Sequence, residues 1–323
     1  MILAPQKKVH LWGVPMADIY GKGLVVYANR WKSENNLFAR FFPVMRATLE
    51  YRIRSLFLAR RQARYLAHVQ RCKTPPSFAQ VEVETQNRCN ASCAFCPVNR
   101  NEPQRPYARM SDGLFTGTIE QLAALQYTKA LSLHSNNEPL LDKRLPDFAV
   151  FARQRLPSAR IKLFTNGMLL SLDLFRTLLP SFDRIFINNY ADKPEMLPNI
   201  REIHDYCLTP EGKKFIEGKS VVIQLRNPDV VLSSRGGNAP NRKPPARALP
   251  FKCLYPFTQF IIRPDGKISL CCNDALGQMT LGDLNEETII NIWRGPAFAD
   301  VRKKMIEQGR AGIPLCTACD FLR

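Results

Sequence analysis

The chain has 323 residues, of which 45% are hydrophobic, so it can bury a sizeable core but is too short for more than about two or three domains. Its formal net charge is +18, which favours acidic partners such as nucleic acid, anionic lipid, phosphorylated compounds or an acidic protein. The ten cysteines are clustered, no signal peptide opens the chain, and no stretch is apolar enough for a transmembrane helix. These features argue against a secreted disulfide scaffold and a membrane-spanning protein, and they predict a cytoplasmic protein whose thiols hold metal.

Residues 1–79 are predicted to form a basic N-terminal extension. Residues 1–88 hold 15 Lys or Arg against 5 Asp or Glu, so more than half of the net charge lies in this part of the chain. Residues 46–70 carry apolar side chains at near-helical spacing surrounded by arginines, which predicts a basic amphipathic helix. We expect this helix to pack on the rest of the chain with a solvated arginine face; the alternative is peripheral contact with a membrane surface.

From residue 80 onward, short apolar runs alternate with helical patterns. This alternation is typical of a parallel sheet covered by helices, which places the chain in the α/β class. Functional side chains then gather at the C-terminal ends of the strands. We predict strands over 81–86, 130–134, 161–164, 184–188 and 220–224, and helices over 112–126 and 146–155.

Three cysteines, Cys89, Cys93 and Cys96, follow the first of these strands with C-x3-C-x2-C spacing. Structural zinc requires four ligands, whereas a 4Fe-4S cluster held by three thiolates keeps one iron open for another ligand. A zinc knuckle that takes its fourth ligand from elsewhere is the alternative. With Phe95 before the last cysteine, the run resembles the signature of the radical S-adenosylmethionine (radical SAM) superfamily.

The resemblance implies a partial parallel (β/α)6 barrel over residues 80–238. It also implies that the open iron binds the amino and carboxylate groups of S-adenosylmethionine, and that reductive cleavage gives a 5'-deoxyadenosyl radical. This chemistry needs a low-potential electron donor, and flavodoxins and ferredoxins are usually acidic, which suits the basic chain. An acidic donor of this kind is therefore an expected partner.

Several strand-end loops extend the resemblance. The sequence Asn136-Asn137-Glu138-Pro139 stands where the family usually has Gly-Gly-Glu-Pro, a loop that receives the ammonium group of the cofactor. Thr165-Asn166-Gly167 resembles another cofactor-binding turn of the family, although alone it would be an ordinary turn. The alternatives for two other residues are that Glu138 is an ordinary acidic residue at the start of a helix and that Arg226 is a solvated arginine at the end of a strand. The resemblance implies cofactor-binding roles for Phe95, Asn137, Glu138, Thr165, Asn166, Asn188 and Arg226.

A second group of cysteines lies beyond an expected linker over 239–252. Residues 260–270 are predicted to form a hairpin with a Pro-Asp-Gly turn, and residues 286–293 and 298–308 to form helices. This pattern resembles the SPASM and shorter twitch auxiliary-cluster domains, here over 253–323, and a zinc ribbon is the alternative. The resemblance implies that a second 4Fe-4S cluster is bound by Cys253, Cys271, Cys316 and Cys319.

Adjacent side chains on a strand point to opposite faces, so only one of Cys271 and Cys272 is expected to bind the cluster. The family pattern favours Cys271. Cys272 is then either core filler or a thiol able to give a hydrogen atom to a substrate radical. Arg235, in a Ser-Arg-Gly-Gly-Asn loop before the linker, is implied to contact the substrate hydroxyl.

The spacing of the last four cysteines is most similar to that of the aminocyclitol dehydrogenase group, best known from 2-deoxy-scyllo-inosamine dehydrogenase. This similarity implies oxidation of a small carbohydrate- or aminocyclitol-like substrate, or its epimerisation if a thiol such as Cys272 quenches the radical. Two alternatives stay open: radical modification of a ribosomal peptide, and a basic zinc-binding module that docks nucleic acid. Nucleic acid is the less favoured partner because aromatic residues are sparse among the arginines.

Overall fold

The computed structural model describes residues 22–28, 60, 62–67, 69, 77–99, 105–191 and 195–321. The described residues form a nine-stranded sheet in the order β1-β6-β5-β4-β3-β2-β7-β8-β9. Every neighbouring pair from β1 to β7 is parallel, and β8 and β9 continue the sheet antiparallel. The strands are β1 Gly23–Ala28, β2 Gln80–Val83, β3 Ala130–Ser132, β4 Arg160–Thr165, β5 Arg184–Tyr190, β6 Ser220–Arg226, β7 Gln259–Ile262, β8 Lys267–Ser269 and β9 Thr280–Asp283.

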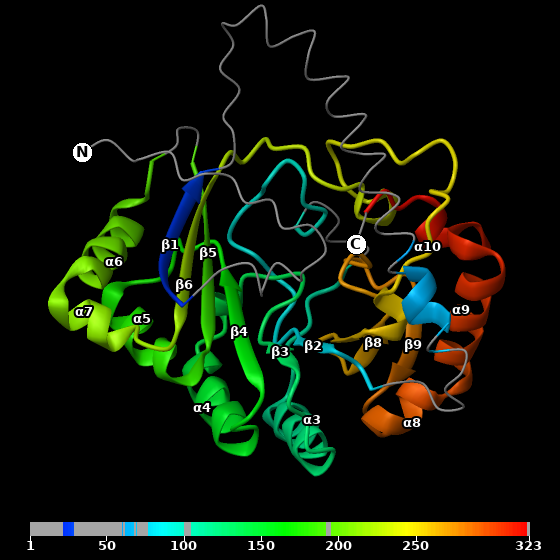
Figure 1. Cartoon of the computed structure of the whole chain (residues 1–323), viewed down its shortest axis with the longest axis horizontal. Helices are drawn as coiled ribbons and strands as arrows, with labels where there is room; N and C mark the ends of the chain where they lie inside the picture. Colours follow the sequence, from blue (N-terminus) through cyan, green and yellow to red (C-terminus); the bar gives the residue numbers. More distant parts are fainter. Residues whose placement is uncertain are drawn as a thin grey trace, which may run out of the picture.

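Helices surround the outside of the curved sheet (Figure 1). Serine and threonine residues begin four of them, since the side chains of Ser111, Ser171, Thr209 and Thr288 each accept a hydrogen bond from a first-turn N–H. Five helices lie along the parallel strands: α3 Asp112–Ala124, α4 Leu145–Arg155, α5 Leu172–Leu178, α6 Pro198–Leu208 and α7 Pro210–Phe215. Three cover the C-terminal part: α8 Ile289–Arg294, α9 Pro296–Glu307 and α10 Pro314–Thr317.

The strands alternate between an outer face packed on helices and an inner, concave face. Leu131, Ile161 and Ile185 lie on the outer face and are fully buried in the core. At the C-terminal end, Phe260 of β7 packs against Trp293 of α8, with ring centroids 6.2 Å apart. Residues one position before or after these core positions, such as Ser132 and Lys162, therefore face the concave side.

The predicted α/β class with a parallel sheet is confirmed, and each predicted strand and helix after residue 80 has a counterpart within a few residues. Two features were not foreseen. Strand β1 lies within the N-terminal extension, yet it pairs with β6 from Gly23 opposite Ser220 to Ala28 opposite Leu225 and forms one edge of the parallel part of the sheet. Strand β7 pairs with β2, so the C-terminal segment continues the same sheet.

Of the helix predicted over 46–70, only residues 60, 62–67 and 69 are among those described, and they are helical. The remainder of that prediction, including its arginine-rich first half, lies outside the described residues. In the part of the chain that the structure describes, no helix is long and apolar enough to cross a membrane.

Candidate functional site

The loop after β2 carries Cys89, Cys93 and Cys96, all half-buried. The side chain of Asn99 fixes this loop, since its amide donates to the carbonyls of Cys89 and, at 3.2 Å, of Ala91. The backbone N–H of Cys96 donates to the carbonyl of Cys93 at 3.0 Å, which turns the loop tightly. Burial raises the pKa of Cys89 to about 12, so this thiol ionises readily only when a metal centre takes the place of the proton.

Glu138 joins two neighbouring strand-end loops. One carboxylate oxygen accepts hydrogen bonds from the Thr165 hydroxyl at 2.7 Å and the Leu140 N–H at 3.1 Å, and the other accepts from the Asn166 N–H at 2.7 Å. Burial raises the pKa of Glu138, while these three donors oppose the shift. The carboxylate is 1% exposed and directed into the protein. Its predicted contact with the cofactor ammonium group stays a prediction, and its visible role is to hold these loops together.

Asn166 connects the Thr-Asn-Gly turn to the cysteine loop. Its side-chain amide donates to Asn90 Oδ1 at 2.7 Å and lies 3.9 Å from the sulfur of Cys89. Asn137 lies on the adjoining loop, where its Oδ1 accepts from the backbone N–H of Ser135 at 3.2 Å. The Asn137 side-chain nitrogen is buried and has no hydrogen-bond partner among the described residues. The structure thus brings these two predicted cofactor residues to the edge of the cysteine loop.

Of the remaining predicted cofactor residues, Asn188 and Arg226 lie on β5 and β6, and Phe95 of the cysteine loop reaches the end of β5. The ring of Phe95 packs against Tyr190, with centroids 5.7 Å apart. Tyr190 pairs with Arg226 in the strand register, and Arg226 donates to Gln224 Oε1 from two nitrogens at 2.8 and 2.5 Å. Asn188 lies opposite Gln224. Tyr190, which directly follows Asn188-Asn189, was expected at this strand end but was not chosen as a site residue.

Two rows of side chains on the concave face were also missed. The ring of Phe164 stacks on Phe186, with centroids 4.4 Å apart, and the ring of His134 lies 5.5 Å from Phe164. Burial, helped by the positive charge of Arg235, lowers the pKa of His134 to about 3, so the imidazole is neutral. Two positions earlier on each strand lies a polar row in continuous register: Glu82, Ser132, Lys162, Arg184 and Ser220. Polar residues at every second position of otherwise apolar strands are the sequence signal for these rows.

A buried ion pair supports the loop that precedes Glu138. Arg105 pairs with Glu84, and both side chains are less than a tenth exposed. Arg105 also donates to the carbonyl of Asn136 at 2.8 Å. Burial raises the pKa of Glu84 and the positive charge of Arg105 opposes the shift. The sequence analysis did not find this pair, because nothing in the local pattern connects residues 21 positions apart.

Arg235 lies between the cofactor loop and the C-terminal segment. Its backbone has a φ of 51°, and its guanidinium donates to the side-chain oxygen of Asn136. The preceding residue, Ser234, is tied to the C-terminal segment, since its N–H donates to Asp320 at 2.7 Å and its hydroxyl donates to Ala318 at 2.7 Å. A Cβ on Gly236 would lie 2.5 Å from a Leu315 methyl group, so this loop packs directly against α10.

The four C-terminal cysteines proposed as ligands line one small cavity. Burial raises the pKa of Cys316 to about 12 and the pKa of Cys271 well above its ordinary value. Four thiols around one enclosed space have the donor chemistry that an iron-sulfur cluster requires. The lining residues are Gly236, Cys253, Tyr255, Cys271, Asn273, Arg310, Leu315, Cys316, Cys319 and Phe321.

Cys272 is not part of this lining. Its side chain packs against the hydrophobic core, and its backbone N–H donates to Gln259 Oε1 at 3.3 Å. The two adjacent cysteines therefore occupy different surroundings, although they lie in the turn after β8 and not on a strand as the sequence analysis assumed. Their assignment as ligand and non-ligand stays a prediction.

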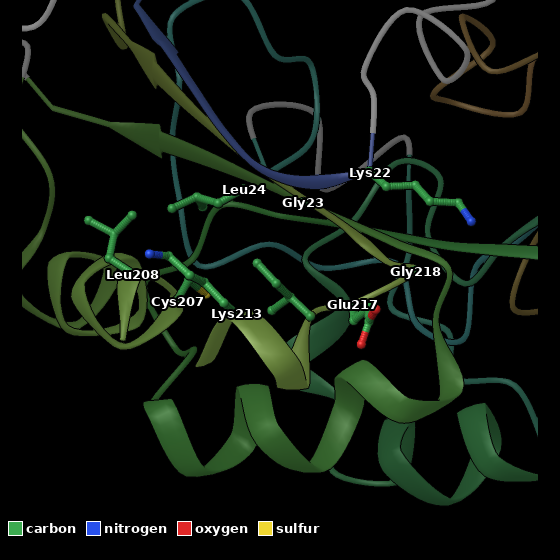
Figure 2. A pocket seen from close by; sticks show the side chains of 9 residues that line it. Lys22, Gly23, Leu24, Cys207, Leu208, Lys213, Glu217 and Gly218 are labelled. Atoms are coloured by element: carbon green, nitrogen blue, oxygen red, sulfur yellow. The ribbon is translucent and has the colours of Figure 1, made fainter. Parts of the chain in front are cut away.

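A hollow of about 410 Å³ lies elsewhere, between β1 and helices α6 and α7. Figure 2 shows Leu24 of β1 facing this hollow together with Cys207 and Leu208 of α6. None of the predicted site residues lines it.

Comparison with known proteins identifies relatives for most of the chain. Residues 253–320 match the family profile of the SPASM iron-sulfur cluster-binding domain. The chain is 28% identical over 244 residues to the S-adenosyl-L-methionine-dependent 2-deoxy-scyllo-inosamine dehydrogenase of Niallia circulans, which covers 75% of this chain and 93% of the relative.

Solved structures give the same result. The crystal structure of BtrN in complex with AdoMet and 2-DOIA superposes with a TM-score of 0.65 at 28% identity, covering 76% of this chain and 94% of that one. BtrN in an open conformation superposes with a TM-score of 0.56 at 23% identity over the same shares, which supports the fold.

Proposed function

We propose that this chain, a radical SAM enzyme with a C-terminal SPASM cluster-binding domain, oxidises a hydroxyl-bearing carbon of a small carbohydrate- or aminocyclitol-like substrate. Similarity to a dehydrogenase over three quarters of the chain supports this proposal. When bound, S-adenosylmethionine and its 4Fe-4S cluster supply a radical that abstracts hydrogen, and the auxiliary cluster supplies a one-electron acceptor. An acidic flavodoxin or ferredoxin is the expected electron donor.

Two sets of thiols are the proposed cluster ligands. Cys89, Cys93 and Cys96 share one turn, and a three-thiolate set leaves an iron open for the cofactor. The side chains of Asn166 and Asn137 lie on loops beside this turn and can bond polar groups of S-adenosylmethionine. The second set comprises the four cysteines that line the C-terminal cavity: Cys253, Cys271, Cys316 and Cys319.

The observation that carries the substrate proposal is a group of buried polar atoms without partners. The hydroxyls of Ser132 and Ser269, the amide nitrogen of Gln259 and Nε of Arg235 are buried and have no hydrogen-bond partner among the described residues. Ser132, Gln259 and Ser269 lie on strand positions that face the concave side. An unpaired buried polar atom costs about 1–3 kcal/mol, so such atoms call for a polar occupant. A substrate rich in hydroxyl or amino groups would supply those partners.

Arg235 is proposed to orient the reacting hydroxyl. A guanidinium stays protonated, so it donates hydrogen bonds and stabilises negative charge on the oxygen but does not remove its proton. The positive charge of Arg235 helps to lower the pKa of His134, so the two side chains are near neighbours. The neutral imidazole of His134 can accept a hydrogen bond from a substrate hydroxyl. The stacked rings of Phe164 and Phe186 offer an apolar surface for the carbon face of a cyclic substrate.

Epimerisation is the second candidate, and the position of Cys272 favours it. This thiol does not line the cluster cavity, and its backbone is bonded to Gln259 on the concave side. In this alternative the thiol, which is half-buried against the core, returns a hydrogen atom to the substrate radical. Peptide modification and the zinc-binding nucleic-acid module have no comparable feature in their favour among the described residues.

The test is anaerobic turnover with S-adenosylmethionine and dithionite, using aminocyclitols and sugars that carry deuterium at single carbinol carbons. Oxidation predicts a product two mass units lighter than an unlabelled substrate, and transfer of the label into 5'-deoxyadenosine. Epimerisation also transfers the label into 5'-deoxyadenosine, but its product has the mass of the unlabelled substrate in ordinary water and is one mass unit heavier in D₂O. The matched variants are Gln259→Leu, expected to raise KM, and Thr116→Val on the exposed side of α3, expected to change nothing. Label transfer from a peptide, but from none of the polyols, would refute the proposal.

A further inference from the structure

Arg310 is a buried cation that has no acidic partner among the described residues. It lies on the short helix η7 Gly309–Gly312, and its side chain is 2% exposed. Its three nitrogen groups donate to backbone carbonyls: Phe251 at 2.9 Å, Cys319 at 3.2 Å and Phe321 at 2.7 Å. No carboxylate pairs with it in the part of the chain that the structure describes. A buried charge without a countercharge is costly, so another source of negative charge is required.

The four cysteines beside it, with the cluster they are proposed to bind, would supply that negative charge. Arg310 lines it together with Cys253 and Cys316, and its charge acts on both sulfurs, where it opposes the rise in pKa that burial causes. A cluster bound by four thiolates carries net negative charge, and reduction adds one more negative charge. A fixed cation at the wall of the cavity therefore stabilises the reduced state more than the oxidised state.

We propose that Arg310 raises the reduction potential of the auxiliary cluster, so that this cluster rather than the cofactor-binding one serves as the electron acceptor. The inference rests on the ligand set proposed above. It does not depend on the identity of the substrate. An opposing negative charge comes from Asp274, which acts on Cys316 and accepts from the backbone N–H groups of Gln278 and Met279. Asp320, the residue after Cys319, is paired with Arg242. The wall of the cavity thus carries one cation that donates to the ligand turn itself, through the carbonyl of Cys319.

Arg302 provides a matched control. It is 5% exposed, lies in the same domain on α9, and donates to the carbonyls of Pro256 at 3.0 Å and Trp293 at 2.7 Å. It does not line the cavity. Arg302→Gln removes an equally buried guanidinium, so it reports the structural cost alone. Arg310→Gln removes both the anchor and the charge beside the cluster, and Arg310→Lys keeps the charge.

The experiment is an EPR-monitored redox titration of the full chain carrying Cys89→Ala, Cys93→Ala and Cys96→Ala, in which the auxiliary cluster gives the only signal. In Arg310→Gln the ratio of reduced to oxidised cluster at a fixed potential should fall by about tenfold or more, a shift of about 59 mV for one electron. Arg310→Lys and Arg302→Gln should stay near the parent. An unchanged potential in Arg310→Gln, or an equal shift in Arg302→Gln, overturns the inference. Absence of a cluster from the parent overturns the ligand set and this inference with it.

A second measurement covers the case in which Arg310→Gln does not retain its cluster. Thermal unfolding of metal-free and reconstituted full-length protein is compared for the same variants. Because the cluster supplies the countercharge, Arg310→Gln should destabilise the reconstituted protein more than the metal-free protein, or prevent reconstitution. Arg302→Gln should lower both midpoints equally and still take up iron. Equal behaviour of the two variants contradicts the inference.

Discussion

Glu138 holds two strand-end loops together by accepting three hydrogen bonds, and we call this set of bonds the Glu138 clasp. The loss of stability on removing the clasp can be predicted from the structure. Replacement by Ala leaves three buried donors without an acceptor: the Thr165 hydroxyl and the N–H groups of Leu140 and Asn166. Each costs about 1–3 kcal/mol, so Glu138→Ala should lower the free energy of unfolding by about 3–9 kcal/mol. Small domains have only about 5–15 kcal/mol in total, so this loss is severe.

The conservative change separates the two roles considered for Glu138. In Glu138→Gln, the amide oxygen can still accept from Thr165 and Leu140, and only the Asn166 N–H loses its partner, so the loss should be about 1–3 kcal/mol. Thr165→Val removes the hydroxyl donor to Glu138 and leaves the Gly167 N–H without its acceptor, so it should cost about 1–3 kcal/mol. Urea unfolding of the metal-free chain measures these values, with cofactor affinity measured separately. Unchanged stability in both Glu138 variants, together with weakened S-adenosylmethionine binding, would refute the clasp and restore the ammonium contact.

Three further predictions concern the rest of the site. His134 has a folded pKa near 3 against about 6.5 when unfolded, so the unfolded chain alone binds its proton as the pH falls. The free energy of unfolding should therefore drop by about 2 kcal/mol from this group between pH 8 and pH 5, and His134→Gln should remove that part of the slope in denaturation measured across this range. Asp320→Ala releases the Ser234 N–H and should raise the substrate KM about tenfold through Arg235, with cofactor cleavage in the absence of substrate unchanged; equal KM values contradict this coupling. Cys272→Ala should leave oxidation intact and abolish any epimer seen by chromatography, whereas lost iron would make Cys272 a ligand.

Local patterns predicted most of the sheet because the parallel strands are buried on both faces. Apolar runs such as the one around Ile161 and Leu163 are visible without tertiary information. Strand β1 was missed for the opposite reason, since its stability comes from pairing with β6, far along the chain. No local pattern around Gly23 encodes that partner.

In the candidate site too, some features could be predicted from local sequence and others depend on contacts between distant segments. The spacing of the cysteines in the sequence predicted both sets of cysteines, and in the structure the four of the second set line one cavity. The direction of the Glu138 carboxylate, the support from Arg105 and the buried charge of Arg310 depend on contacts between distant segments, which spacing does not encode. The polar row that includes Glu82 and Lys162 could have been found, since polar residues recur on one face of apolar strands.

The most direct test of the two-cluster account is the iron and sulfide content after anaerobic reconstitution, followed by cleavage of S-adenosylmethionine with dithionite. The wild type should bind about eight irons and release 5'-deoxyadenosine, and the variant with Cys89, Cys93 and Cys96 all changed to Ala should bind about four and release none. Cys207→Ala, which removes a buried thiol of α6 outside both groups, should behave as the wild type. Stoichiometric zinc without iron, or cofactor cleavage by the triple variant, would contradict the account.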